Sequence, residues 1–223
     1  MGGLLFYDWS TLPFVILVLV ISFTLHEFAH AYSAYKLGDS TAYQFGRVSL
    51  NPMVHLDLFG TIMLLIAGFG WAKPVPVNRG NFKKPRLMGI IVTAAGPLSN
   101  LILVFITLFV FAIFEKYGWL QGMSKGSGDA IVLFLRLMLN INLTLFLFNL
   151  IPIPPLDGYR IIQDLVNLKY TESLQKFEQW ASVIFLLVVF VRPLRQVTLD
   201  PYLRLGNEIV VFFLKPIGWI LGM

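Results

Sequence analysis

The chain has 223 residues, of which 57% are hydrophobic and only 13% are charged. In soluble domains about a quarter of all residues are charged. Here the charged share is smaller and the apolar residues gather in long runs. The composition therefore excludes an ordinary soluble domain and predicts a polytopic membrane protein. No cysteine is present, so disulfide and thiol chemistry are excluded. The excess of 17 Lys and Arg over 12 Asp and Glu indicates loops near anionic lipid rather than nucleic acid as a partner.

The first apolar run, residues 12–37, is long enough to cross a bilayer. It is too long for the apolar region of a signal peptide, and no Lys or Arg precedes it, so we expect it to remain in the mature protein. Residues 41–50, TAYQFGRVSL, alternate loosely in polarity and predict a short strand or hairpin. Residues 58–70, LFGTIMLLIAGFG, are apolar but shorter than the ~20 residues that a span needs, and their glycines favour a re-entrant segment.

The rest of the chain holds further apolar segments and a short helix expected at the membrane interface. Spans are predicted at residues 87–114, 130–151 and 177–191 (the last could begin near 171), the interfacial helix at 158–168, and a fifth apolar segment at 203–221 that either spans or lies at the interface. The fold class is therefore an all-α polytopic membrane protein. It has about four to five transmembrane helices and a short β-strand or re-entrant element after the first span.

The distribution of basic residues predicts the orientation of the chain. If residues 58–70 return to the side from which they enter, the basic loop at 73–86 lies on the same side as the loop after the first span and the segment after the third. Cytoplasmic loops carry an excess of Lys and Arg, so this side is assigned to the cytoplasm and the N-terminus to the outside.

The run HEFAH at residues 26–30 puts three ionisable side chains inside the first span. On a helix His26 and His30 project from one face and can reach one metal ion, while Glu27 can face the water that the metal activates. Two ligands and a general base are the arrangement of zinc hydrolases, in which zinc lowers the pKa of water to ~7. The alternative is a purely structural polar cluster. It is costly, because each ionisable side chain within a membrane costs at least ~2.5 kcal/mol and needs a partner.

A catalytic zinc ion commonly has a third protein ligand. Asp157 follows the third span in NLIPIPPLDGYR, where three prolines prevent a continuing helix. Irregular backbone at membrane depth is tolerated only where it lines a cavity or is buried in protein, so an aspartate there could reach back to the first span. From these residues alone the Asp-Gly pair could equally be an ordinary turn. His55, outside the first span, is the alternative third ligand.

Together these motifs resemble the site-2 protease family of intramembrane zinc metalloproteases, in particular its small prokaryotic members. HEFAH resembles the metal-binding helix of the family, and NLIPIPPLDG at 149–158 resembles its second motif. The resemblance extends over about residues 12–170 through GRVSLNP at 46–52, GFGWAKPVPVN at 68–78 and AAGPLSN at 94–100.

The resemblance implies that His26, His30 and Asp157 bind one zinc ion (Zn²⁺) and that Glu27 is the catalytic base. It implies that Asn149 steadies the substrate carbonyl or oxyanion, a task suited to an amide N–H, although asparagine is also common at helix ends. The expected activity is that of an endopeptidase which cleaves a membrane protein or peptide in or near a transmembrane segment. The expected location is the cell membrane, with the active site nearer the cytoplasm.

We expect one domain, residues 1–223, with a core at 12–170 and C-terminal helices at 171–223. Many relatives carry a PDZ domain or a nucleotide-binding domain, and neither is expected here, because the loop at 115–129 is too short for the first and no soluble tail exists for the second. A non-proteolytic metal-binding membrane protein, such as a transporter or a chaperone-like relative, is the alternative function. Glu27 distinguishes the two, because only a hydrolase needs a base that does not bind the metal.

Overall fold

The computed structural model describes residues 7–67, 70–166 and 171–222, and in these ranges the regular elements are all helices. The helices are α1 (Leu12–Lys36), α2 (Thr41–Gln44), α3 (Leu58–Ala67), α4 (Pro85–Lys116), α5 (Lys125–Asn149), α6 (Asp157–Leu165), α7 (Thr171–Phe190), α8 (Arg192–Val197), α9 (Leu199–Leu203) and α10 (Leu205–Leu221). Two short 3-10 turns lie at Pro52–Val54 and Arg79–Asn81. The predicted interfacial helix corresponds to α6, and residues 167 and 168 of that prediction lie outside the described ranges.

Three helices of the described part are long and apolar enough to cross a membrane, namely α1, α4 and α5. These match the first three predicted spans, and their length and apolar composition are those of an integral membrane protein. The fourth and fifth predicted segments are also helices, but the apolar part of α7 is confined to Phe177–Phe190 and α10 has 17 residues. Both are shorter than the length that a span normally requires.

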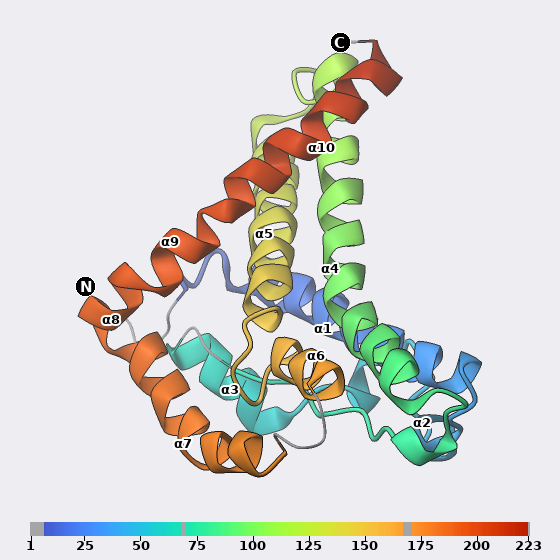
Figure 1. Ribbon diagram of the computed structural model, residues 1–223. Coiled ribbons are helices and arrows are strands. Elements are labelled where there is room, and N and C mark those ends of the chain that lie inside the picture. The colour runs from blue at the N-terminus through green and yellow to red at the C-terminus, as the bar shows by residue number, and fades with distance from the viewer. Residues whose placement is uncertain (1–6, 68–69, 167–170, 223) are drawn as a thin grey trace.

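The long helices are arranged so that α1 and α5 run in the same direction. Val15, near the start of α1, belongs to a cluster that includes Leu137 of α5, whereas His26 farther along α1 lies beside Asp157, which follows the end of α5. The start of α4 packs against the end of α1, so α4 runs in the opposite direction. Figure 1 shows α4 beside α5, with α10 slanting across their upper ends and α6 below α5.

A bend in α4 brings its first turns toward α2 (Figure 1). Pro97 lies inside this helix and lacks the backbone N–H that would bond to the carbonyl of Thr93, which is a common cause of helix bending. The upper part of α4 packs on α10 through a core of Val104, Leu108 and Ile217.

The strand predicted at residues 41–50 is wrong, because this stretch begins as the short helix α2. The carboxylate of Asp39 accepts hydrogen bonds from both the backbone N–H and the hydroxyl of Thr41, which fixes a helical turn at that point. Gly46, with φ of 68°, then reverses the chain in a conformation that favours glycine. Local capping therefore prevails over the weak alternation in polarity.

The segment around α3 returns to the side from which it leaves. Leu56 and Ala72 form an isolated antiparallel bridge, and the N–H of Lys73 donates to the carbonyl of His55 at 2.8 Å, so both ends of the segment lie side by side. A Cβ at Gly60 would lie 2.1 Å from the carbonyl oxygen of Trp71, so the returning chain needs glycine there. This geometry is the one expected of a re-entrant segment. Gly68 lies outside the described residues.

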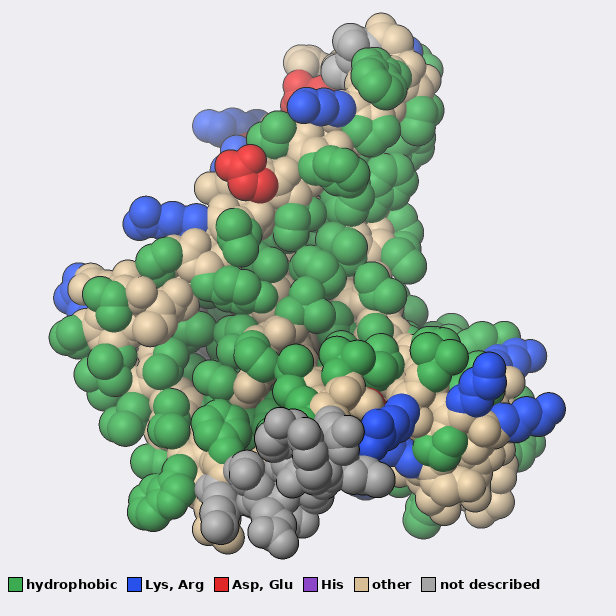
Figure 2. Space-filling model, viewed as in Figure 1, with side chains coloured by type: hydrophobic (Ala, Val, Ile, Leu, Met, Phe, Trp, Pro, Cys, Tyr) green, Lys and Arg blue, Asp and Glu red, His purple; other side chains and the backbone are tan. Residues whose placement is uncertain are grey.

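Apolar side chains cover much of the molecular surface. Figure 2 shows hydrophobic side chains across the face in view, with Lys and Arg gathered toward its edges, near α2 at lower right and along α8 to α10 at left. An apolar surface of this extent matches a lipid environment, and the basic edges match contact with headgroups.

Candidate metal centre

Three buried side chains from two distant parts of the chain converge on one point. The Nε2 atoms of His26 and His30 lie 3.1 Å apart, and each lies 3.2 Å from Oδ2 of Asp157. All three residues are at least nine-tenths buried. Within the described ranges, they form a group of metal-ligating atoms close enough together to hold one ion.

This triangle of atoms fits zinc. A tetrahedral zinc ion with bonds of ~2.0 Å places its ligand atoms ~3.3 Å apart, close to the separations of 3.1 and 3.2 Å found here. Two imidazoles and one carboxylate are also a ligand set of catalytic zinc sites, which leave a fourth position open. The residues present therefore suit a zinc ion both in geometry and in donor chemistry.

Helix α4 orients both imidazoles. Nδ1 of His26 lies 2.7 Å from Oδ1 of Asn100, and Nδ1 of His30 lies 2.8 Å from the backbone carbonyl of Val92. Both partners are acceptors, so each ring carries its proton on Nδ1 and keeps the lone pair of Nε2 for a metal. The helix thus fixes the tautomer that zinc binding requires.

A second amide extends this support to α5. Nδ2 of Asn100 donates to Oδ1 of Asn142 at 2.9 Å, and Nδ2 of Asn142 donates to the carbonyl of Met138 at 2.8 Å. Both asparagines are fully buried. Neither asparagine is among the site residues that the sequence predicts.

Gly96 makes room for the two histidines. A Cβ on this residue would lie 2.2 Å from Nε2 of His30 and 2.7 Å from Nε2 of His26, so no larger residue fits without moving the site. Val92, Gly96 and Asn100 are spaced four residues apart and therefore share one face of α4. Gly96 and Asn100 lie within AAGPLSN at 94–100, but their spacing alone does not show which helix this face of α4 meets.

The loop between α5 and α6 delivers Asp157 to the histidines. Asp157 is the first residue of α6, and a Cβ on the next residue, Gly158, would lie 2.3 Å from the carbonyl oxygen of Leu150. The Asp-Gly pair is thus a close contact between α6 and the preceding loop rather than an ordinary turn. Burial raises the pKa of Asp157, but the positive charge of His30 and His26, when their rings are protonated, lowers the pKa more, to below its usual value. The carboxylate therefore stays ionised, as a ligand must be.

Of the other predicted site residues, Glu27 and Asn149 line the cleft that contains the three ligands, whereas His55 lies outside it. The amide of Asn149 donates to the carbonyl of Leu145 at 3.0 Å. His55 does not join the group. Its ring is fully buried elsewhere, with Nε2 2.7 Å from the carbonyl of Ser49, so the structure brings Asp157 rather than His55 to the two histidines.

The cleft has a volume of about 570 Å³ and reaches from the ligands past α6 and the extended segment 70–77. A space of this size is typical of sites that bind a small molecule or a few residues of a peptide. Glu27 is buried within it, next to the ligands in sequence but outside their group. Such an arrangement can bind a metal ion, hold a carbonyl group near it and remove a proton from water.

Comparison with family models matches residues 125–191 to Peptidase family M50. The matched stretch contains α5, α6 and α7 and therefore includes Asn149 and Asp157.

Comparison with curated proteins finds relatives along most of the chain. YwhC of Bacillus subtilis (strain 168), named as a zinc metalloprotease, is 48% identical over 213 residues, which cover 95% of this chain and 95% of that protein. Proteins named as zinc metalloprotease Rip2 from Mycolicibacterium smegmatis and Mycobacterium tuberculosis (strain H37Rv) are 29% and 30% identical. These alignments cover 76% and 78% of this chain, and 64% and 65% of the relatives. No solved structure gives a significant match.

Proposed function

This chain belongs to peptidase family M50, the site-2 protease family, and is a zinc metalloendopeptidase, and from that premise we propose that it hydrolyses a peptide bond in or near a transmembrane segment of another membrane protein. Its role would then be regulated intramembrane proteolysis. The observation that carries the proposal is the convergence of His26, His30 and Asp157 beside Glu27 on a helix apolar enough to cross a membrane.

The ligands, the base and the amide have separate tasks in this mechanism. One zinc ion, when bound by His26, His30 and Asp157, supplies Lewis acidity toward the scissile carbonyl and lowers the pKa of water. Glu27 takes the proton from the attacking water and later delivers it to the leaving amine, a role that its burial beside the ligands supports. Asn149 turns its amide from the carbonyl of Leu145 toward the substrate and donates to the developing oxyanion.

The substrate must be unwound before it can react, because a membrane helix satisfies its own backbone groups and shields its carbonyls. Residues 70–77 offer an edge on which an unwound segment can pair. Pro74 and Pro76 lack an N–H, whereas Val75 and Val77 line the cleft, and their N–H groups make no hydrogen bond with any described residue. Alternate residues of an extended chain direct these groups to one side, so Val75 and Val77 can bind substrate by strand addition. This edge replaces residues 41–50 as the candidate strand.

The active site lies nearer the cytoplasmic face of the cell membrane in this proposal. The ends of α1 and of the α3 segment both approach the basic loop 73–86, and positive residues favour the cytoplasm. The non-proteolytic alternative, a metal transporter or chaperone-like protein, is not favoured, because its metal site has no use for the buried Glu27 outside the ligand group.

Replacement of Glu27 by Gln tests the proposal. The variant should lose cleavage and retain zinc, because the base lies outside the ligand group. Metal analysis of purified protein and comparison of membrane peptides from cells with wild type or Glu27→Gln measure the two effects. Peptides that appear only with wild type would identify substrates. Retained cleavage would refute the mechanism, and loss of zinc would make Glu27 a ligand or a structural residue.

A further inference from the structure

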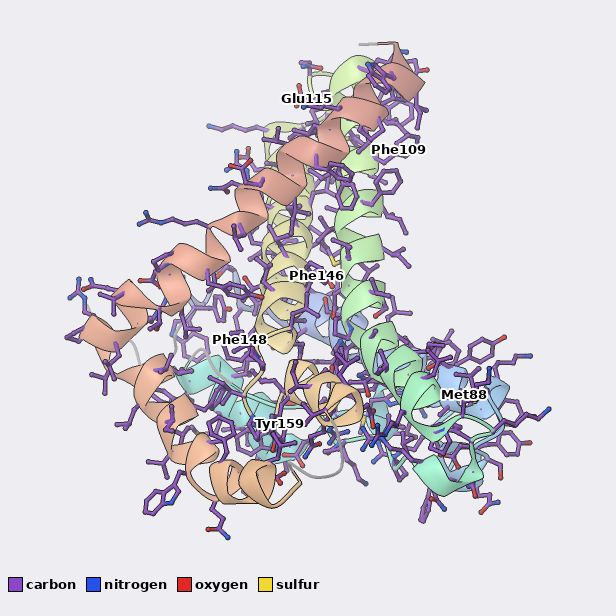
Figure 3. The ribbon with its side chains drawn as sticks, viewed as in Figure 1. Met88, Phe109, Glu115, Phe146, Phe148 and Tyr159 are labelled. Atoms are coloured by element: carbon purple, nitrogen blue, oxygen red, sulfur yellow. The ribbon has the colours of Figure 1, made fainter. Side chains whose placement is uncertain are left out.

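The residues that line the cleft fall into two chemically unlike halves. One half is apolar and aromatic, with Phe23 from α1, Phe148 from α5 and Phe185 from α7. The rings of Phe148 and Phe185 meet edge to face with centroids 5.6 Å apart, and Figure 3 shows Phe148 at the lower end of α5, toward α6 and α7. This half suits the apolar residues of a transmembrane segment.

The other half is polar and carries positive charge. It is lined by Arg79 from the loop before α4 and by Arg160 and Gln163 from α6. Asp157, Arg160 and Gln163 are spaced three residues apart, so the side of α6 that supplies the ligand also supplies these polar groups.

Contacts along α4 place the polar half on the side of the basic loops. Asn100 supports His26, Val92 supports His30, and Gly89, one turn nearer the start of α4, faces Arg79 and Asp164. The polar half therefore lies beyond His30, toward the loop that precedes α4. Phe23 lies before His26 on α1, toward the opposite end of the helix.

The two arginines differ in their partners. Arg79 forms an ion pair with Asp164 at 2.8 Å, whereas Arg160 forms no ion pair with any residue in the described ranges. The pair with Asp164 offsets the charge of Arg79 and leaves that of Arg160 available within the cleft.

We propose that Arg160 forms a subsite for a carboxylate of the substrate, an Asp or Glu side chain on the side of the scissile bond away from the apolar half. The inference rests on the proposed proteolytic function and names its substrate class: a transmembrane segment with an acidic residue in its cytoplasmic flank. Arg160 lies ~4.5 Å along α6 from Asp157, and an extended substrate advances ~3.3 Å per residue. Arg160 therefore meets a residue about one or two positions from the scissile bond.

This subsite would disfavour most membrane proteins as substrates. Cytoplasmic flanks of transmembrane segments are commonly basic, and a Lys or Arg opposite Arg160 would be repelled. An acidic flank is uncommon there, so one arginine gives selectivity to an enzyme whose apolar half binds many sequences.

Synthetic peptides with an apolar stretch of Leu, Ala and Gly test this subsite. They end in a C-terminal amide, which excludes a terminal carboxylate, and differ only by Asp, Asn or Lys in the polar flank. With zinc-loaded wild type we expect kcat/KM to fall from Asp to Lys by about fivefold, the effect of one partly exposed ion pair. Arg160→Glu should reverse the order. The control variant Arg192→Glu changes an exposed arginine of α8 outside the cleft and should leave the order of the three peptides unchanged.

Two measurements separate failure of the subsite from failure of the proposed function. Equal cleavage of all peptides by wild type, or an unchanged order in Arg160→Glu with normal zinc content, would overturn the subsite and leave the protease intact. Absence of any cleavage would count against the proposed function. In that case fluorescence anisotropy of labelled peptides with Glu27→Gln still decides the subsite, because equal affinity for the Asp and Lys peptides would overturn it.

Discussion

At the scale of single residues, the candidate site depends on groups that never touch the metal. The amide of Asn100 fixes His26, the amide of Asn142 fixes Asn100, and the carbonyl of Val92 fixes His30. These partners fix the direction of each Nε2 lone pair, so the two histidines are preorganised before an ion binds.

Replacing Asn100 by Leu should therefore weaken zinc binding by about 10- to 100-fold, the usual effect of losing such a partner. Asn142→Leu should have a smaller effect in the same direction, because it leaves the acceptor of His26 in place. Asn140→Leu is the matched control, since Asn140 lies on the same helix and is exposed. Competition with a chromogenic chelator measures the affinities. Equal affinities in all three variants would contradict the orienting role.

The choice of third ligand is a second prediction at this scale. Asp157→Ala should empty the site, because its carboxylate lies 3.2 Å from both imidazoles. His55→Ala should keep its zinc, because the ring of His55 is buried against the carbonyl of Ser49. Elemental analysis of both purified variants decides between them. A full site in Asp157→Ala with an empty one in His55→Ala would reverse the assignment.

At the scale of elements, one buried carboxylate, that of Asp39, joins the turn after α1 to the loop before α4. Asp39 accepts from Thr41, from the backbone N–H of Asn78 at 2.7 Å and from the side-chain amide of Asn81 at 2.7 Å. Burial raises the pKa of Asp39, but these hydrogen bonds lower the pKa more, to below its usual value. The carboxylate therefore ties the end of α1 to the loop that forms one wall of the cleft.

The lowered pKa of Asp39 sets the direction of a pH effect. The contribution of Asp39 is fully present above the ordinary carboxyl pKa and is lost as pH falls through the lower, folded value. Asp39→Asn removes the charge at neutral pH, so hydrogen exchange should speed up at the N–H of Asn78. Asp129→Asn, at an exposed carboxylate with no hydrogen bond to a described residue, should cause no change. Unchanged exchange in Asp39→Asn would contradict the anchoring role.

The sequence predicted those elements whose signals are local. Apolar length alone located α1, α4 and α5, and the spacing of His26 and His30 defines a single face of one helix. The prediction of a strand at 41–50 is wrong because the hydrogen bonds from Thr41 to Asp39 favour a helical turn, and this outweighs a weak alternation in polarity. Asn100 was missed because its role exists only when α4 packs antiparallel to α1, a tertiary arrangement that no local pattern encodes. From local pattern alone Asp157 was ambiguous for the same reason, because the return of the loop from α5 to α1 is also tertiary, and the resemblance to the family was what assigned it as a ligand.

At the scale of the whole molecule, the site can form only if α1 and α5 run in the same direction. The return of the α3 segment makes this possible, since its two ends meet at Leu56 and Ala72. A complete crossing at that point would reverse α5 and place Asp157 on the far side of the membrane from the end of α1. The hydrogen bonds from Asn78 and Asn81 to Asp39 likewise keep the loop before α4 on the side where α1 ends.

This arrangement predicts which positions share one side of the membrane, and the absence of native cysteine allows a direct test. Single cysteines at Gln44 and Lys83, both exposed and both outside the hydrogen bonds to Asp39, should react with an impermeant thiol reagent only from the cytoplasmic side. A cysteine at Met123, in the loop between α4 and α5, should react only from the opposite side. Labelling of Gln44 and Lys83 from different sides would mean that the α3 segment crosses the bilayer. Asp157 could then not reach His26 and His30, and the three-ligand site would be refuted together with the topology.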